Sequence, residues 1–544
     1  MRNLSTKCYL LSTDIRKWIF SNKLEFTLLV LILLAGALFR LYKIDQYMTF
    51  LGDEGRDAII VRRLLVDFDL ILVGPGTSIG NMYLGPLYYY MMAPFLLLFN
   101  FNPVGPAVMV ALLGVATTFF VWYVVRNWFS NGQGPSLSAG ALMAAGLYAI
   151  APVVIVYSRS SWNPNIMPFF ALLMIYSIWK FWHEKKYKWI IVALVSLAFA
   201  LQSHYLGLLL APVFGLFWLL TTFEVVRSPK SKVRSQKTMK KLFLRYTLFS
   251  GGLFTFLMSP LVIFDSRHGW RNFEAMKVFF TERQTTVSAK PWSALPKLWP
   301  LIDQYGERIL AGKNSEVGTV FAIFIVSSLL WLLVARLQKI GTKKLKAYLL
   351  IAIWLFMAFV GLGVYKQHIY DHYFGFIYPA GFILIGALIS ELNSFFNKYG
   401  KVLIGALLLV VVLVNLKENP LRYNPNRQMQ RAMAVAEKIE SETGGSPLNL
   451  AVVAERNYED GYQYFLEKNN VEVLEIDPQR HKETVADQLF VVCEYEDKNE
   501  CDPTHNPKAQ VANFGWSKID GEWEIEGVIL YKLVHVENEE EIKS

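Results

Sequence analysis

Long apolar runs separated by short polar gaps fill most of the chain up to residue 416. A membrane-spanning helix needs roughly 20 mostly apolar residues, and about 11 runs approach that length. They are residues 24–42, 104–128, 137–157, 166–182, 189–201, 205–226, 242–264, 317–337, 345–365, 373–392 and 402–416. The pattern therefore predicts an α-helical polytopic membrane protein with about 11 spans.

A further apolar run, residues 86–99, is too short for a comfortable span and suits an interfacial or re-entrant helix. If it does not cross, the N-terminus and the basic gaps near residues 183–188, 227–245 and 336–346 all fall on the cytoplasmic side, as Lys and Arg usually do. The segments then predicted outside are residues 43–101, 158–165, 202–204, 265–316, 366–372 and everything after Lys417.

Composition agrees with this class, since 54% of the 544 residues are hydrophobic and only 18% are charged. The net charge of +10 comes from basic residues spread over the gaps, which predicts the lipid bilayer as partner and no nucleic acid. The N-terminal stretch is polar to Lys23, and the following run is long enough to stay as an anchor. We therefore expect a multi-pass protein of the plasma (inner) membrane, without a cleavable signal.

After Lys417 the composition becomes that of a soluble domain. Strands are predicted at residues 448–454, 471–476 and 488–493, a helix at 460–468 and a hairpin arm at 522–534. The predicted division is a transmembrane module, 1–416, with outside loops 43–101 and 265–316, and an exported α/β domain with its C-terminus outside, 417–544. Cys493 and Cys501 share that domain, either as a disulfide or as two unrelated thiols, whereas Cys8 is predicted cytoplasmic.

An acidic cluster, residues 52–57 (Gly-Asp-Glu-Gly-Arg-Asp), follows the first apolar run. Ionised carboxylates beside a bilayer are costly and usually functional. Asp53, Arg56 and Asp57 stand at i, i+3 and i+4, so they share one face of a helix, with Glu54 beside it. Asp53 is the candidate catalytic base, and the structural alternative is that it caps a helix starting at Glu54.

A glycine-rich stretch, residues 74–86, separates this cluster from the short apolar run 86–99. Glycine lets a backbone approach a ligand closely, and Pro86 is predicted at the first position of the short helix. Two juxtamembrane helices joined by such a loop are expected to roof a cavity. The long loop 265–316 is expected to gate it.

Other polar residues of the outside segments are candidate cavity-lining residues. Arg159 ends one span, either near a phosphate or as an arginine that reaches the interface. Asn163 lies in the polar break that follows, His204 at a hairpin tip, and His268 at the start of the long loop.

The predicted outside segment 366–372 is dense in polar groups, namely Lys366, His368, Asp371 and His372, and Tyr373 follows it. His368 and His372 are four residues apart, so on a helix they could share a divalent metal. The glutamate of the protease zinc helix is absent. Phosphate contact by Lys366 and His372 is therefore favoured, with no cofactor required.

Several of these motifs together resemble the GT-C glycosyltransferases. They are Asp53-Glu54 in the first outside loop, Tyr157-Ser158-Arg159 at an outer helix end, and His372-Tyr373-Phe374 followed by Tyr378-Pro379. The nearest branch is similar to protein O-mannosyltransferases and lipid A aminoarabinose transferases. The resemblance covers the chain to about residue 416 and leaves the C-terminal domain's role open.

This resemblance implies transfer of a sugar from a polyprenyl-phosphate carrier to an acceptor hydroxyl of a glycan, lipid or protein at the outer membrane face. Asp53 matches the family's first acidic position and is expected to act as general base. Glu54 matches the second and is expected to orient Arg56 or another cation. The expected donor-phosphate and substrate contacts are Arg56, Arg159, Lys366, His372 and Tyr373, with Asp57, Asn163, His204 and His268 lining the cavity.

The chain also departs from these relatives. The aminoarabinose branch carries an acidic-Lys-Pro-Pro element where residues 83–87 here read Tyr-Leu-Gly-Pro-Leu. A lysine phosphate contact or a metal is therefore not expected at that point. The large outside insert of eukaryotic protein mannosyltransferases is missing, so protein Ser or Thr as acceptor is unsupported.

Two other classes compete with the enzyme. A lipid-linked-sugar flippase or transporter should show mid-span polar residues or broken helices in paired halves. Here the predicted mid-spans are nearly all apolar. A non-catalytic envelope binding protein would not need the acidic cluster, so the pattern favours a glycosyltransferase.

Overall fold

The computed structural model describes residues 16–77, 82–129, 137–227, 233–281, 287–288, 290–335, 342–395, 398–495 and 500–536. Cys8, residues 78–81 of the glycine-rich stretch, and parts of the basic gaps at 228–232 and 336–341 lie outside these ranges.

Helices form over all the predicted apolar runs, because a backbone in hydrocarbon must pair its polar groups internally. They are α2 (Lys23–Leu41), α6 (Val104–Phe129), α7 (Ala139–Ile150), α8 (Pro152–Tyr157), α9 (Met167–Ile178), α10 (Trp189–Ser203), α11 (Leu210–Arg227), α12 (Val233–Arg267), α15 (Ser315–Ala335), α16 (Thr342–Gly363), α17 (Tyr378–Phe395) and α18 (Lys398–Lys417).

Among the described residues, seven helices are long and apolar enough to cross a membrane, or eight if the pair Pro291–Leu310 and Ser315–Ser328, bent by 119°, is one span. Shorter apolar helices cover other predicted runs, including α7 and α10. The polytopic helical class is thus confirmed, while the figure of about 11 crossings stays a prediction.

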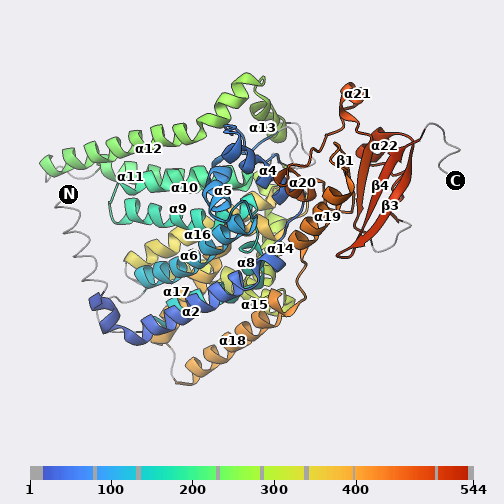
Figure 1. Cartoon of the computed structure of the whole chain (residues 1–544). Helices are drawn as coiled ribbons and strands as arrows, with labels where there is room; N and C mark the ends of the chain where they lie inside the picture. Colours follow the sequence, from blue (N-terminus) through green and yellow to red (C-terminus); the bar gives the residue numbers. More distant parts are fainter. Residues whose placement is uncertain are drawn as a thin grey trace.

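The long helices pack into one bundle with the C-terminal sheet at one end (Figure 1). Small residues allow the closest crossings, as is common between membrane helices. A Cβ on Gly140 of α7 would lie 2.1 Å from the carbonyl oxygen of Gly386 of α17. These two backbones therefore meet without side chains between them.

The segment 43–101, which is predicted to be outside, forms three helices, α3 (Ile44–Tyr47), α4 (Gly52–Val66) and α5 (Leu87–Leu98). Pro86 precedes α5 rather than occupying its first position. The glycine-rich stretch folds back on itself, since Gly74 N donates to Leu84 O at 2.7 Å and Leu84 N to Pro75 O at 2.9 Å.

The predicted loop 265–316 is largely helical. It contains the end of α12, then α13 (Arg271–Thr281), α14 (Leu295–Tyr305) and the single turns η5 (Pro291–Ala294) and η6 (Gly306–Leu310). Asp265 accepts hydrogen bonds from Asn272 N at 2.7 Å and Phe273 N at 3.2 Å, which satisfies amides at the start of α13. Asn272 Oδ1 in turn accepts from Tyr83 N at 2.6 Å, which ties this segment to the glycine-rich stretch.

After α18 the chain forms a four-stranded sheet in the order β1-β2-β4-β3. Its elements are α19 (Gln428–Glu442), β1 (Asn449–Val453), α20 (Asp460–Lys468), β2 (Gln488–Cys493), α22 (Ala509–Phe514), β3 (Ser517–Ile525) and β4 (Val528–His535). Strands β1 and β2 are parallel and the other pairs antiparallel. Buried residues of α19 and α20 cover one face of the sheet, and those of α22 cover the other.

The strands at β1 and β2 and the helix α20 confirm the sequence prediction. The strand predicted at 471–476 is wrong, because this segment makes a single parallel bridge, between Val473 and Leu448, before turning at Pro478. The predicted arm 522–534 is a complete hairpin. Glu526 and Gly527, both at positive φ, form its two-residue turn.

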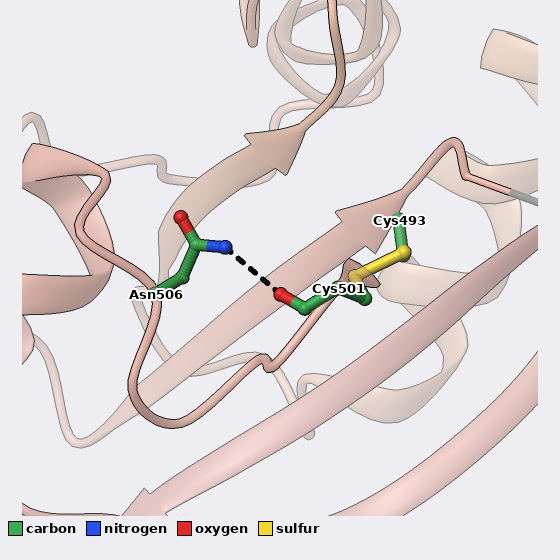
Figure 2. Close-up of a disulfide and its surroundings, with 3 residues drawn as sticks. All are labelled: Cys493, Cys501 and Asn506. Carbon is green, nitrogen blue, oxygen red and sulfur yellow. Dashed lines mark hydrogen bonds between the residues drawn. A yellow bond between two sulfur atoms is a disulfide. The ribbon is translucent and has the colours of Figure 1, made fainter. Parts of the chain in front are cut away.

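Cys493 and Cys501 form a disulfide, with their Cα atoms 5.9 Å apart (Figure 2). Cys493 is the last residue of β2, and Asn506 Nδ2 donates to Cys501 O at 2.9 Å beside the bridge. The two thiols, which the sequence left open, are therefore a pair. Such bonds persist mainly in oxidising compartments.

Candidate functional site

A cavity of about 250 Å³ lies where the segments predicted to be outside meet the ends of the helices. The short turns η1 (Asn163–Ile166), η3 (Tyr205–Leu209) and η7 (Asp371–Ile377) contribute to its wall together with α4 and the glycine-rich stretch. Its lining residues are Asp53, Arg56, Pro75, Gly76, Thr77, Leu84, Trp162, Asn163, Pro164, His204, Tyr205, Tyr370, His372 and Tyr373. Residues of α4 and of the glycine-rich stretch thus line a cavity, as predicted, whereas none of its described lining residues comes from α5. Six predicted site residues meet there.

Asp53 lies in the first turn of α4, because the helix begins at Gly52 and Leu51 is its N-cap. The capping role considered for Asp53 is therefore wrong. Its Oδ1 accepts from Arg56 Nη1 at 2.9 Å, and 45% of its side chain is exposed. Among the described residues Oδ2 has no hydrogen-bond partner, and the side chain lines the cavity.

Arg56 is held between two carboxylates. Its Nε and Nη2 donate to Asp57 Oδ1 at 3.1 and 2.8 Å, and Tyr89 Oη donates to the same oxygen at 2.8 Å. Burial raises the pKa of Asp57 to about 6, against the opposing effect of the Arg56 charge. With the bond from Nη1 to Asp53, three N–H groups of the guanidinium are used on the two carboxylates, and the side chain also lines the cavity.

Glu54 does not orient Arg56, contrary to the sequence prediction. Its Oε2 accepts from Leu51 N at 3.1 Å, so it caps the start of α4, and its side chain is buried. Asp57, deep behind Arg56, performs the orienting role that was assigned to Glu54. Burial raises the pKa of Glu54 to about 7.

His204 faces the cavity as a neutral imidazole. Burial, and next the charge of His372, lower its pKa to about 3. Nδ1 accepts from Leu206 N at 3.2 Å, which places the proton on Nε2. The side chain is therefore a hydrogen-bond donor toward a ligand rather than a cation.

Aromatic rings surround His372. Its ring centroid is 4.6 Å from that of Trp162, 4.7 Å from Tyr373 and 5.8 Å from His204. Asn163 Nδ2 donates to Ser203 O at 2.6 Å, which joins η1 to the hairpin that carries His204. These contacts bring four predicted residues from three distant segments into one wall.

The helical condition for a metal shared by His368 and His372 is not met, because η7 begins at Asp371 and His368 lies in the irregular chain before it. Within the part of the chain that the structure describes, no group of three or more His, Cys, Asp or Glu residues is arranged to hold a metal ion.

Five of the eleven predicted site residues do not line the cavity: Glu54 and Asp57, described above, and Arg159, Lys366 and His268. Arg159 donates to the carbonyl oxygens of Phe39 and Tyr42, at 2.5 and 2.8 Å, at the end of α2. These bonds satisfy terminal carbonyls of the helix, which is a structural role. Lys366 is exposed, and His268 stacks on Phe264 at 4.0 Å on the outer end of α12.

Other residues of the site escaped the sequence analysis. Trp162 and Tyr370 line the cavity, and Tyr89 bonds Asp57. Trp162 follows Arg159 in the same polar break, which was a usable signal. Tyr89 sits within three consecutive tyrosines of an apolar helix, and nothing in that run distinguishes it.

Glu54→Gln is expected to raise stability at pH 8 by roughly 1–3 kcal/mol. The pKa of Glu54 is higher in the folded protein than in the unfolded chain, so the protonated side chain favours the folded state. This contribution to the free energy of unfolding is complete below the pKa of the unfolded chain and is lost as the pH rises through about 7. Glutamine still accepts from Leu51 N and stays neutral. Thermal unfolding of the detergent-purified protein at pH 5 and pH 8 tests this, with Glu472→Gln, on an exposed carboxyl, as control.

The family of dolichyl-phosphate-mannose-protein mannosyltransferases matches residues 84–236. That match begins near the end of the glycine-rich stretch and includes Arg159, Asn163 and His204. No curated protein matches the chain.

Solved structures share the fold over most of the chain. The apo structure of ArnT from Cupriavidus metallidurans has a TM-score of 0.56 at 14% identity and covers 92% of this chain and 97% of that chain. The same protein bound to undecaprenyl phosphate gives 0.54 at 14% identity, with the same coverage. The Archaeoglobus fulgidus oligosaccharyltransferase in complex with Zn and sulfate gives 0.51 at 12% identity, over 93% of this chain and 72% of that chain.

The archaeal enzyme is longer than this chain. This chain covers 64% of its length in one of its structures and 72% in another. At these identities the likeness concerns the fold. The chain has the GT-C fold, and the family match and this fold together support glycosyltransferase chemistry in general.

Proposed function

We propose that this GT-C-fold chain is a membrane glycosyltransferase that moves a sugar from a polyprenyl-phosphate carrier to an acceptor hydroxyl. One observation carries the proposal: Asp53 and Arg56 face one cavity together with His204 and His372, although these residues come from distant segments. A base beside a cation is the pair that such a transfer requires.

In the proposed step the acceptor oxygen attacks the anomeric carbon of the sugar. The bond from that carbon to the carrier phosphate breaks, and the phosphate leaves with the electron pair. The acceptor proton passes to Asp53 Oδ2. A single in-line displacement of this kind inverts the anomeric carbon.

Negative charge develops on the departing phosphate, and preplaced donors stabilise it most where water is scarce. The positive guanidinium of Arg56 and the Nε2–H of His204 are the assigned stabilising groups, with His372 and Tyr373 beside them. Undecaprenyl phosphate, which ArnT binds, has the phosphate chemistry that suits these groups.

We place the cavity at the outer face of the plasma membrane, with the N-terminus in the cytoplasm. In this orientation the basic gaps between the spans lie on the cytoplasmic side of the membrane, where Lys and Arg usually occur. The disulfide of the C-terminal domain fits an oxidising compartment outside. Reporters inserted near Lys237 and near Asn470 are expected on opposite sides of the membrane. Both on one side would mean that the parity of the spans is wrong.

The test is a transfer assay in liposomes that contain the purified protein, a panel of polyprenyl-phosphate sugars, and hydroxyl-bearing glycans or lipids as acceptors. We expect loss of one donor with formation of free polyprenyl phosphate and glycosylated acceptor. Movement of intact donor across the bilayer without its consumption would instead identify a flippase.

A further inference from the structure

We propose that the C-terminal domain positions the catalytic carboxylate, with Asn457 as the residue that fixes the first turn of α4. This inference rests on the proposed function, because it concerns the same Asp53. It gives the domain a role in the transfer that the sequence left open.

The anchoring contact is buried and specific. Asn457 Oδ1 accepts from Gly52 N at 2.9 Å, and the residue is 6% exposed. Its Nδ2 donates to Glu494 Oε1 at 2.5 Å, and Tyr462 Oη donates to the same oxygen at 2.6 Å. The Gly52 amide at the start of α4 is therefore linked through the Asn457 side chain to the carboxylate of Glu494, which follows the disulfide-bonded Cys493.

Two glycines of the acidic cluster are explained by this docking. A Cβ on Gly55 would lie 2.4 Å from the backbone of Asp460, and a Cβ on Gly52 would lie 2.6 Å from Tyr458 Cβ. Helices α4 and α20 thus meet backbone to backbone, where a side chain has no room.

The contact continues along α4 in both directions. Before the helix, the Phe50 ring lies 5.5 Å from Phe465 and 6.2 Å from Tyr464, centroid to centroid. Near its end, Arg63 pairs with Glu467 at 2.7 Å. The domain therefore holds α4 at its start, its first turn and its last turn.

Among the described residues, the side-chain hydrogen bond of Asp53 stays within α4, since its partner is Arg56 on the same helix. The position of Asp53 relative to the facing cavity wall is thus set by how α4 is held. Tyr89 holds the second turn through Asp57, and Asn457 holds the first. A displacement near 1 Å can lower a rate about 10²-fold.

Asn457→Ala and Glu494→Ala are each expected to lower kcat about 10- to 100-fold, with KM for the donor changed less than about 3-fold. Glu494→Gln keeps an acceptor oxygen and should restore most of kcat. The double variant should be no worse than either single one, because both act through the same contact. Asn469→Ala is the matched control, since Asn469 bonds Glu440 at 2.6 Å on the exposed side of the domain.

Hydrogen exchange of the peptide containing Gly52 gives a second readout. We expect faster exchange in Asn457→Ala and Glu494→Ala at unchanged unfolding temperature, and unaltered exchange in Asn469→Ala. If either anchor variant fails to fold, Gly55→Ala, with Gly251→Ala in open space on α12 as control, repeats both measurements.

The inference would be overturned if Asn457→Ala and Glu494→Ala kept the wild-type kcat. It would also be overturned if Asn469→Ala lost as much kcat as these two variants. A wild-type protein without transfer activity would instead contradict the proposed function. The exchange measurement would then still report whether Asn457 holds the start of α4.

Discussion

Asp53→Asn is expected to lower kcat for sugar transfer by about 10²–10⁴-fold, the usual contribution of a general base. An amide does not accept the acceptor's proton at neutral pH. The substituted side chain keeps an oxygen for the hydrogen bond from Arg56 Nη1, so α4 and the ion pair of Arg56 with Asp57 should persist. KM for the donor should therefore change only a few-fold.

The measurement is a single-turnover assay in liposomes with saturating donor, which isolates the chemical step. Asp67→Asn is the matched control, because Asp67 is an exposed carboxylate at the other end of the same helix. A folded Asp53→Asn variant with wild-type turnover would remove Asp53 from its role as base. Equal losses in both variants would point to a general effect of charge on the helix.

Much of this site was predictable because hydrophobic periodicity and local spacing determine it. The apolar runs predicted the helices, and the i, i+3, i+4 spacing put Asp53, Arg56 and Asp57 on one face, as their ion pairs confirm. Glycine content also predicted that backbone of residues 74–86 would wall a cavity, which Pro75 and Gly76 now line.

What the sequence missed depends on tertiary contacts that have no local signature. Arg159 lies beside the site in sequence, yet its guanidinium finds the free carbonyls that end α2. Glu54 caps α4 instead of orienting Arg56, because the helix begins two residues earlier than a cap at Asp53 would require. Asp57, expected to line the cavity, bonds Arg56 instead. The two glycines of the cluster received no interpretation from the sequence, and Gly55 is explained only by the close approach of the α20 backbone.

Arg56→Ala is expected to have the largest effect on stability, about 3–5 kcal/mol, as well as abolishing transfer. Asp57 is fully buried, and among the described residues its Oδ2 has no hydrogen-bond partner. Without the guanidinium, Tyr89 is its one remaining hydrogen-bond partner among the described residues, so the carboxylate must be protonated or remain uncompensated. Arg63→Ala is the control, since its exposed pair with Glu467 should contribute less than about 1 kcal/mol.

Adding Asp57→Asn to Arg56→Ala separates the two roles of this arginine. The neutral amide removes the buried charge, so most of the lost stability should return in thermal unfolding. Transfer should stay at least about 10²-fold below wild type, because the cavity still lacks the cation that stabilises the leaving phosphate. A double variant that regains both stability and transfer would make Arg56 a purely structural partner of Asp57, and the donor phosphate would then depend on His204 and its neighbours.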